Sequence, residues 1–304
     1  MWLRLLRYGY LSPRATFLLT VILCVGLTSL LVGAAYVLAV STERPATLDR
    51  SRLGALAFSE DFSHGLGLYD EDRHVGRWRT QYLNDGIDSR ASRTHGEAQC
   101  YVDPKFAGLG LQPFHIRPDK REGDVLQITL DRAPAALQRA CYGSPYGSGM
   151  ISSQPSFAMT DGYWEIRAKM PRPAPGVWPA IWLLPEDGTW PPEIDIVEMA
   201  KGVLNSTLHS SVTGEHVADG TSHPELGDLS AGFHTFGLLK TGEEIVWYLD
   251  DKEVKRVPAS YDLGKPFYII INLAMGQGGW VGDPGPNSTP ALLEIASIRA
   301  YRLK

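Results

Sequence analysis

Three acidic side chains lie close together in the segment EIDIVE, residues 193–198. Successive side chains of a β-strand point to opposite faces, so Glu193 and Asp195 share a face, whereas Glu198 in a regular strand belongs to the other face. A β-bulge adds one residue to a strand and is common beside active sites. We predict such a bulge between Asp195 and Glu198, because it returns Glu198 to the face of the other two acids.

Carboxyl groups gathered on one face cannot all ionise easily, because each negative charge raises the pKa of its neighbours. One group then keeps its proton near neutral pH while another stays charged. A proton donor and a charged carboxylate on either side of a glycosidic bond are the groups that hydrolyse it. The segment therefore indicates glycoside hydrolysis, with Glu193 and Glu198 as the outer pair.

Clustered carboxylates have two other uses. They often cover an exposed strand face without any chemistry, and their oxygens bind Ca²⁺ or Mg²⁺. Calcium sites usually take their ligands from a loop rather than from one strand, so catalysis is favoured over metal binding here. The cysteine spacing and the scattered histidines fit no zinc pattern, and we assign no metal ligand.

Tryptophans surround the acids in the sequence, and indole rings stack on the apolar faces of sugars. Trp190 and Trp280 lie in segments rich in glycine and proline and are the stronger candidates for sugar contacts. Trp178 and Trp182 share one face of a strand, so both could be buried. Trp178 is nevertheless included among the expected substrate contacts.

The elements that position these residues are short strands, separated by clusters of glycine, proline, asparagine and aspartate. Long helical periodicity is absent. This pattern predicts an antiparallel β-sandwich of jelly-roll type, formed as a single domain by residues 57–304. The expected strands cover residues 125–130, 162–169, 180–184, 194–197, 206–211, 233–239, 245–249, 267–273 and 291–301.

The N-terminus has the features of a membrane anchor. Residues 1–14 contain three arginines and no acid, and residues 15–40 contain no charged side chain. About 20 apolar residues span a bilayer, whereas the apolar part of a cleavable signal has only about 7–15. We expect a cytoplasmic segment over residues 1–14, a transmembrane signal anchor over residues 15–40 and a linker over residues 41–56. The domain is then periplasmic or extracellular, or secreted if the anchor is cleaved.

The rest of the composition limits the partners. The net charge is −5 and the basic residues are scattered among acids, so no nucleic-acid partner is expected. We expect a monomer. Cys100 and Cys141 lie in the exported part, where they either form one disulfide or remain buried thiols.

The segment from SSQPSF to EIDIVEM, residues 152–199, resembles glycoside hydrolase family 16, which contains laminarinases, lichenases, agarases and carrageenases on a curved β-jelly-roll. The likeness extends over about residues 58–304. It implies that Glu193 is the nucleophile, that Glu198 is the general acid and then the base, and that Asp195 hydrogen-bonds the nucleophile. The six-residue form of the motif is similar to the bulged, laminarinase-like branch, whose members retain anomeric configuration.

Other segments extend the likeness. GEAQCY resembles a cleft element, STLHSS a strand with a cleft histidine, and MGQGGW a late cleft loop. Two departures are Lys240, where a tryptophan is common, and Ala296, where an aspartate often accompanies a structural calcium. We expect no cofactor, with a structural calcium as the alternative. The additional substrate contacts implied by the likeness are Glu97, Gln99, Tyr101, His209, Gln277 and Trp280.

Residues and likeness together predict a retaining endo-β-glycanase whose partner is a polysaccharide: a β-glucan, a β-galactan or a bacterial exopolysaccharide. A transglycosylase, in which an acceptor sugar replaces water, is the nearest alternative. A sugar-binding lectin is a third possibility, since one fold hosts several functions. A lectin predicts a damaged set of acids, and here all three are present.

Overall fold

The amount of burial along a strand follows its sequence pattern. In β10 (Val203–Ser210) buried residues alternate with half-buried ones, as expected for a strand with one face on the core. In β15 (Phe267–Met275) every residue is buried, and its sequence is a nearly continuous apolar run. The computed structural model describes residues 46–83, 89–211 and 214–304.

The strands form two sheets. The larger has ten strands in the order β14-β13-β12-β7-β16-β4-β5-β2, with β1 paired to β16 and β3 to β4; the smaller has six in the order β11-β10-β9-β8-β15-β6. The larger sheet contains β1 (Leu53–Glu60), β2 (Gln99–Tyr101), β3 (Phe114–Asp119), β4 (Gly123–Arg132), β5 (Tyr146–Ser148), β7 (Gly162–Lys169), β12 (His234–Lys240), β13 (Glu244–Leu249), β14 (Lys252–Pro258) and β16 (Ala291–Leu303). The smaller contains β6 (Met150–Ser152), β8 (Val177–Pro185), β9 (Glu193–Ala200), β10, β11 (Val217–His223) and β15.

Short helices occupy a few of the connections between strands. The α-helix α2 (Ala135–Ala140) precedes β5. The other helical segments among the described residues are 3₁₀ turns: η1 (Arg50–Arg52), η3 (Arg93–His95), η4 (Phe106–Gly108), η5 (Pro224–Leu226) and η6 (Tyr261–Leu263).

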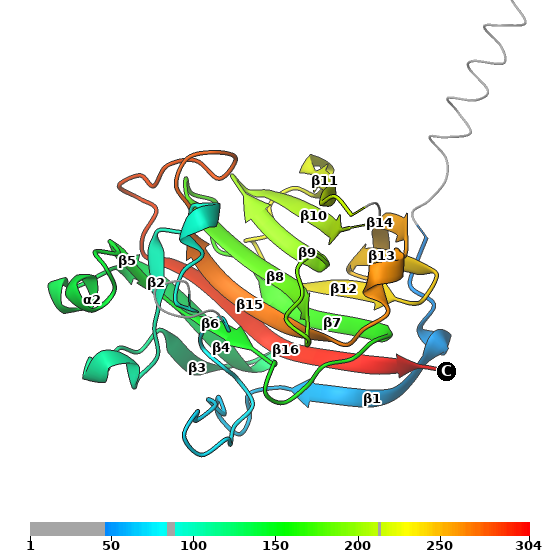
Figure 1. Ribbon diagram of the computed structural model, residues 1–304, viewed down its shortest axis with the longest axis horizontal. Helices are drawn as coiled ribbons and strands as arrows, with labels where there is room; N and C mark the ends of the chain where they lie inside the picture. The colour runs from blue at the N-terminus through cyan, green and yellow to red at the C-terminus, as the bar shows by residue number, and fades with distance from the viewer. Residues whose placement is uncertain (1–45, 84–88, 212–213) are drawn as a thin grey trace, which may run out of the picture. The chain divides into compact units, whose positions relative to one another are not determined.

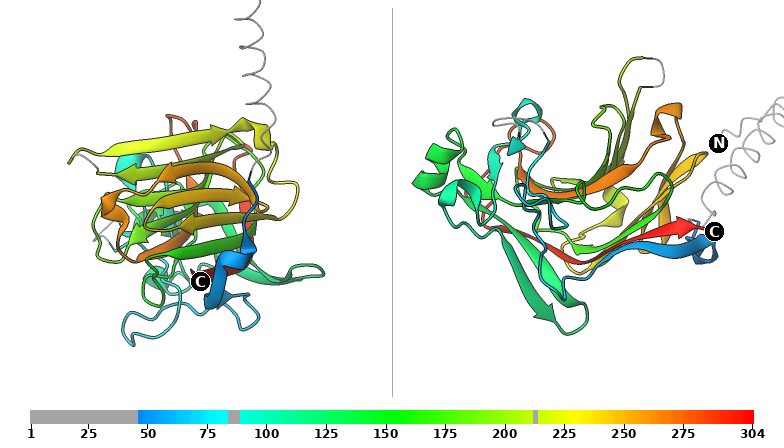
Figure 2. Two further views of the ribbon diagram at one scale, coloured as in Figure 1. Left: turned by 90° about the vertical axis from the view of Figure 1, so that its right-hand side faces the viewer. Right: turned by 60° about the horizontal axis from the view of Figure 1, so that its bottom comes forward.

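The two sheets pack face to face in a sandwich (Figure 1), and Figure 2 shows them as separate layers from two further sides. Their facing side chains form one core, to which Leu126 and Ile166 contribute from the larger sheet and Ile181 and Val197 from the smaller. Pairing is antiparallel except between β2 and β5. The predicted all-β, jelly-roll-like sandwich is confirmed.

The folded unit begins earlier than expected. It runs from Thr47 to Lys304, so the end of the expected linker belongs to it. The Leu48 N–H donates to the Asp251 carbonyl at 2.8 Å, and the Arg50 guanidinium lies 2.8 Å from carboxylate oxygens of both Glu165 and Asp251. These contacts join residues that are far apart in the sequence. The polar composition of residues 47–50 alone therefore does not predict that this stretch is part of the folded unit.

The expected membrane anchor at residues 15–40, and the cytoplasmic segment before it, lie outside the described residues. Within the part of the chain that the structure describes, no helix is both long and apolar enough to cross a bilayer.

The two exported cysteines form a disulfide. Cys100 on β2 is bonded to Cys141, which directly follows α2, across a sequence separation of 41 residues. Both are buried against the apolar side chains of Val102 and Leu137. The structure thus selects the disulfide over two buried thiols.

Candidate active site

A β-bulge interrupts β9 within the acidic segment. Along β8, Ile181 pairs with Val197, but the next residue, Trp182, pairs with Asp195. One step on β8 therefore corresponds to two steps on β9, and the extra residue is Ile196. The bulge lies where the spacing of the acids predicts it.

The strand on the other side of β9 shows what the bulge does to the acids. Glu198 lies opposite Asn205 of β10, Asp195 opposite Thr207, and Glu193 opposite His209. These three partners are two residues apart along β10, so they share one face of the sheet. Their acidic counterparts share it too.

Side chains satisfy the backbone carbonyls that the bulge frees from the strand ladder. The indole Nε1 of Trp247 donates to the Asp195 carbonyl at 2.8 Å, and the Ser206 hydroxyl donates to the Ile196 carbonyl at 3.2 Å. The buried ammonium of Lys255 lies 4.9 Å from the centre of the Trp247 indole ring and donates to the Ser206 carbonyl at 3.1 Å. Because an unpaired buried carbonyl is costly, these contacts stabilise the bulge.

A cleft of about 870 Å³ lies over this face. It crosses the smaller sheet from β11 to β15 and is lined mainly by acidic, aromatic and small polar side chains. Within the described ranges, no lysine or arginine lines it. The acidic and aromatic lining residues are Glu97, Glu193, Asp195, Glu198, Tyr82, Trp178, Trp182, Trp190, Tyr268 and Trp280, and His95 and His209 are the histidines.

The two outer acids each accept a hydrogen bond from a tryptophan. Trp178 Nε1 donates to Glu198 Oε1 at 3.1 Å, and Trp190 Nε1 donates to Glu193 Oε2 at 2.6 Å. Burial, with the charge of Glu193 as a second cause, raises the pKa of Glu198 to about 7, against the lowering effect of the Trp178 hydrogen bond. Glu198 is therefore suited to donate a proton near neutral pH.

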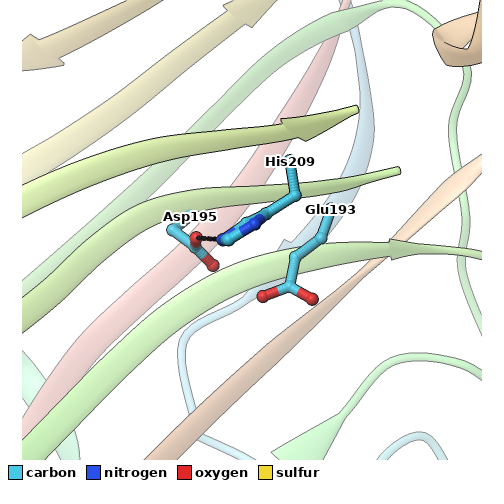
Figure 3. Close-up of side chains that lie close together, drawn as sticks. All are labelled: Glu193, Asp195 and His209. Atoms are coloured by element: carbon cyan, nitrogen blue, oxygen red, sulfur yellow. Dashed lines mark ion pairs between the residues drawn. The ribbon is translucent and has the colours of Figure 1, made fainter. Parts of the chain in front are cut away.

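Asp195 is the most deeply buried of the three, with 2% of its surface exposed. Burial raises its pKa well above the usual value, and the charges of Glu198 and Glu193 raise it further. A protonated Asp195 can donate a hydrogen bond to Glu193. Its Oδ2 atom lies 3.2 Å from His209 Nε2, the contact drawn in Figure 3.

Three rings pack together at the side of the acids. His209 Nδ1 lies 2.8 Å from His216 Nε2, and the two imidazoles stack with centroids 5.1 Å apart. Trp190 packs against His216, with centroids 4.8 Å apart. Burial, more than any neighbouring charge, lowers the pKa of His209. His209 is therefore held neutral beside Asp195.

Comparison with known proteins identifies the family to which the chain belongs. The model of the glycosyl hydrolases family 16 matches residues 114–295 of this chain. The chain belongs to glycoside hydrolase family 16. The endo-1,3-1,4-beta-glycanase ExsH of Rhizobium meliloti (strain 1021) is 38% identical over 262 residues, which are 84% of this chain and 53% of ExsH. This chain thus spans about half the length of that relative.

Two further proteins extend the comparison. A glucan endo-1,3-beta-glucosidase of Cryptopygus antarcticus is 33% identical over 259 residues, or 73% of this chain and 86% of that protein. The laminarinase structure from Rhodothermus marinus has a TM-score of 0.63 and 27% identity, and the match covers 82% of this chain and 97% of that one. The predicted likeness to laminarinases is therefore confirmed.

Glu97 lines the family 16 cleft as expected, but its carboxylate is already occupied by protein donors. Oε1 accepts from the Tyr101 hydroxyl at 2.8 Å and from the Tyr82 hydroxyl at 3.1 Å, and Oε2 accepts from the Ser92 N–H. Burial raises the pKa of Glu97.

Three expected substrate contacts do not line the cleft. Gln99 is fully buried and its Oε1 accepts from the Met275 N–H at 2.7 Å, because a side chain is needed there to satisfy the end of β15. Tyr101 lies beneath the cleft floor and its hydroxyl is used by Glu97. Gln277 is exposed, outside the lining. Of the expected contacts, Glu97, Trp178, Trp190, His209 and Trp280 do line the cleft.

Lys240, a departure from the family pattern, is buried and does not line the cleft. Its ammonium donates to Asp161 Oδ1 at 3.1 Å and to the Thr160 carbonyl, and lies 5.3 Å from the centre of the Phe267 ring. The change from the tryptophan common in the family therefore affects the end of β12 inside the larger sheet.

Several cleft residues were not predicted. Trp182 is partly exposed, lines the cleft on the same face as Trp178, and donates from Nε1 to Asn272 Oδ1 at 2.7 Å. Trp178 and Trp182 point to the same face of β8, so both are expected in the cleft once β8 is placed beside the acidic strand. Tyr82 lies in an irregular segment without a strand pattern, and no local signal marks it. The other unpredicted polar or aromatic lining residues include Asn205, Thr207, Tyr268, Asn272 and His95.

Proposed function

We propose that this chain is a retaining endo-β-glycanase that hydrolyses internal bonds of a neutral β-glucan. The observation that carries the proposal is the bulge in β9, which places Glu193, Asp195 and Glu198 on one face inside the cleft. A lectin has no need for a bulge that aligns three acids, or for an acid that keeps its proton near pH 7.

In the proposed reaction, the protonated Glu198 donates its proton to the glycosidic oxygen as that bond breaks. Glu193 attacks the anomeric carbon and forms a glycosyl-enzyme intermediate. Glu198, now a carboxylate, takes a proton from a water molecule, which attacks the same carbon and releases Glu193. Configuration is retained because the carbon is inverted twice.

The neighbours of the nucleophile have supporting roles in this proposal. Trp190 orients Glu193 through the 2.6 Å hydrogen bond. A protonated Asp195 donates to Glu193 and stabilises its charge until the carbon–oxygen bond forms. This chemistry uses carboxyl groups of the chain alone.

The cleft supports an uncharged substrate. Its acids have no basic counterpart among the described lining residues, so a sulfated or carboxylated sugar would meet like charge. The path from β11 to β15 crosses five strands, about 19 Å at the usual strand spacing, which is several sugar units long. The name of the Cryptopygus antarcticus glucan endo-1,3-beta-glucosidase supports a β-1,3-glucan, and the name of the endo-1,3-1,4-beta-glycanase ExsH supports mixed 1,3-1,4 linkages.

We also propose that the enzyme is exported and held at the membrane by residues 15–40. The Cys100–Cys141 disulfide supports an oxidising compartment. Added protease should cleave the domain either on intact cells, if it is extracellular, or once the outer envelope is opened, if it is periplasmic; resistance until the cytoplasm is released would overturn this location.

The function is tested by measuring reducing ends released from laminarin, lichenan, a β-galactan and carboxymethyl curdlan. We expect activity on the neutral glucans and loss of at least 1,000-fold, roughly 4 kcal/mol in the barrier, in Glu193→Gln. Glu186→Gln is the matched control, because Glu186 is exposed and lies outside the cleft lining. Equal rates for the Glu193 variant and wild type would contradict the assignment, and longer products than substrate would indicate a transglycosylase.

A further inference from the structure

A group of three metal-ligand side chains lies within the cleft. Glu193, Asp195 and His209 each offer one ligand atom, and these atoms lie within 4.8 Å of one another. Glu193 and His209 are direct partners on β9 and β10, so the sheet register fixes their proximity. Figure 3 shows the imidazole reaching across to Asp195 with the Glu193 carboxylate beside them.

The Asp195 carboxylate provides a second, independent observation. Only 2% of the residue is exposed, and among the described residues its Oδ2 atom has no hydrogen-bond partner. That atom lies 3.2 Å from His209 Nε2 but does not form a hydrogen bond with it. Two ligands that are each about 2.0–2.1 Å from a tetrahedral Zn²⁺ lie roughly 3.4 Å apart, so the observed spacing suits an ion between them.

Two ligands already have the outer partners that orient metal ligands. A metal on His209 Nε2 requires the proton on Nδ1, and His216 Nε2 lies 2.8 Å away to accept it. Trp190 holds Oε2 of Glu193 and leaves Oε1 for coordination. Such outer contacts fix the ring tautomer and the carboxylate orientation before the ion arrives.

The donor set and the charge select the class of ion. Imidazole suits Zn²⁺ and Cu²⁺, whereas Ca²⁺ and Mg²⁺ take oxygen ligands. The carboxyl groups of Glu193 and Asp195 bind a metal as carboxylates, and with no lysine or arginine in the described cleft lining their charge suits a divalent cation. Three protein ligands also leave a coordination position for water.

We propose that Glu193, Asp195 and His209 form a site for a zinc-class divalent cation, and that occupancy inhibits hydrolysis by engaging the nucleophile. The inhibition rests on the function proposed above. The binding does not, because it depends only on the three side chains and their partners.

Binding is tested on the full-length, chelator-treated protein by calorimetric titration with Zn²⁺ alone. We expect one ion per chain, with affinity lowered at least tenfold in His209→Gln and in the near-isosteric Asp195→Asn. His95→Gln is the matched control, since His95 lines the cleft outside the group, and it should bind as wild type does. His216→Ala should lose about tenfold, the lower end of the effect of removing an outer partner.

Several results would overturn the proposal. Absence of one-to-one binding of Zn²⁺ would do so. An equal loss of Zn²⁺ affinity in His95→Gln and His209→Gln would also do so, because it indicates that Zn²⁺ binds to separate histidines rather than to one site. A folded Asp195→Asn protein with unchanged affinity removes Asp195 from the site. If Zn²⁺ binds as expected but hydrolysis continues at saturation, the inhibitory part is wrong; if Zn²⁺ binds and no glycan is cleaved without it, only the proposed function fails.

Discussion

Trp178 Nε1 donates a hydrogen bond to Glu198 Oε1 at 3.1 Å, and this indole is the neighbour that favours the charged form of Glu198. Burial and the Glu193 charge act in the opposite direction and prevail, so the pKa of Glu198 is about 7. The balance between these effects sets the pH range in which the proposed acid can work.

The alkaline limb of the pH profile should therefore lie near pH 7. Glu198 must be protonated to donate, so kcat/KM should fall as pH rises through that value. The limb reports an apparent value for the carboxyl cluster rather than for Glu198 alone, since charges on neighbouring acids influence one another. Initial rates on lichenan between pH 4 and pH 10 measure it, and constant kcat/KM up to pH 9 would contradict the role of Glu198.

Replacing Trp178 by phenylalanine should move that limb to higher pH. The substitution removes the N–H that stabilises the Glu198 carboxylate, so the pKa of Glu198 rises. The height of the profile should also fall, because Trp178 packs against Trp280 at the cleft wall with centroids 5.6 Å apart. Trp280→Phe is the control: it should lower the rate and leave the limb in place.

Stability should depend on pH through Glu198. The pKa of Glu198 is about 7 in the folded protein and near the usual glutamate value of 4.5 in the unfolded chain, so the stability present below pH 4.5 is lost as pH rises to 7. Glu198→Gln removes that loss. The Tm of the variant should match that of wild type at pH 4 and exceed it at pH 8. The corresponding gain in the free energy of unfolding at pH 8 should be on the order of 1–3 kcal/mol. An equal difference at both pH values would show that Glu198 does not titrate in this way.

The bulge should weaken when its indole donor is removed. Trp247→Phe keeps an aromatic ring next to Lys255 but leaves the buried Asp195 carbonyl without the 2.8 Å hydrogen bond. The free energy of unfolding in urea should fall by about 1–3 kcal/mol, and kcat should fall more than KM changes, because the acids lose their alignment. Phe236→Leu, which also changes a core side chain, is the comparison. It should lower the free energy of unfolding by a similar amount and leave kcat unchanged, which separates a loss of core packing from a loss of alignment of the acids.

The sequence predicts those parts of the fold that have a local pattern. The run at residues 162–169 coincides with β7, and the turn residues Asp250 and Asp251 separate β13 from β14, both with positive φ. β11 has the sequence VADGTSH and is mostly exposed, so only its pairing with β10 makes it a strand. The strands β2, β5 and β6 have three residues each, too few to show a period.

The site divides in the same way. The bulge follows from spacing alone, since Glu193, Asp195 and Glu198 can share a face only with one extra residue. Whether the Tyr101 hydroxyl faces a sugar or Glu97 depends on packing between segments, and the structure places it on Glu97. His216 directly precedes β11 and contacts His209 of β10. No local pattern in the sequence indicates this contact.

The central claim is that Glu193 is the nucleophile and Glu198 the acid on one bulged strand. It is tested most directly by supplying azide to Glu193→Ala and Glu198→Ala with an activated β-glucoside and determining the anomeric configuration of the product by NMR. Azide that replaces the nucleophile attacks once and gives an α-glycosyl azide, whereas azide that intercepts the glycosyl-enzyme in the absence of the base gives the β-product. The account predicts α from Glu193→Ala and β from Glu198→Ala; the reverse assignment, or no rescue in either variant, would contradict it.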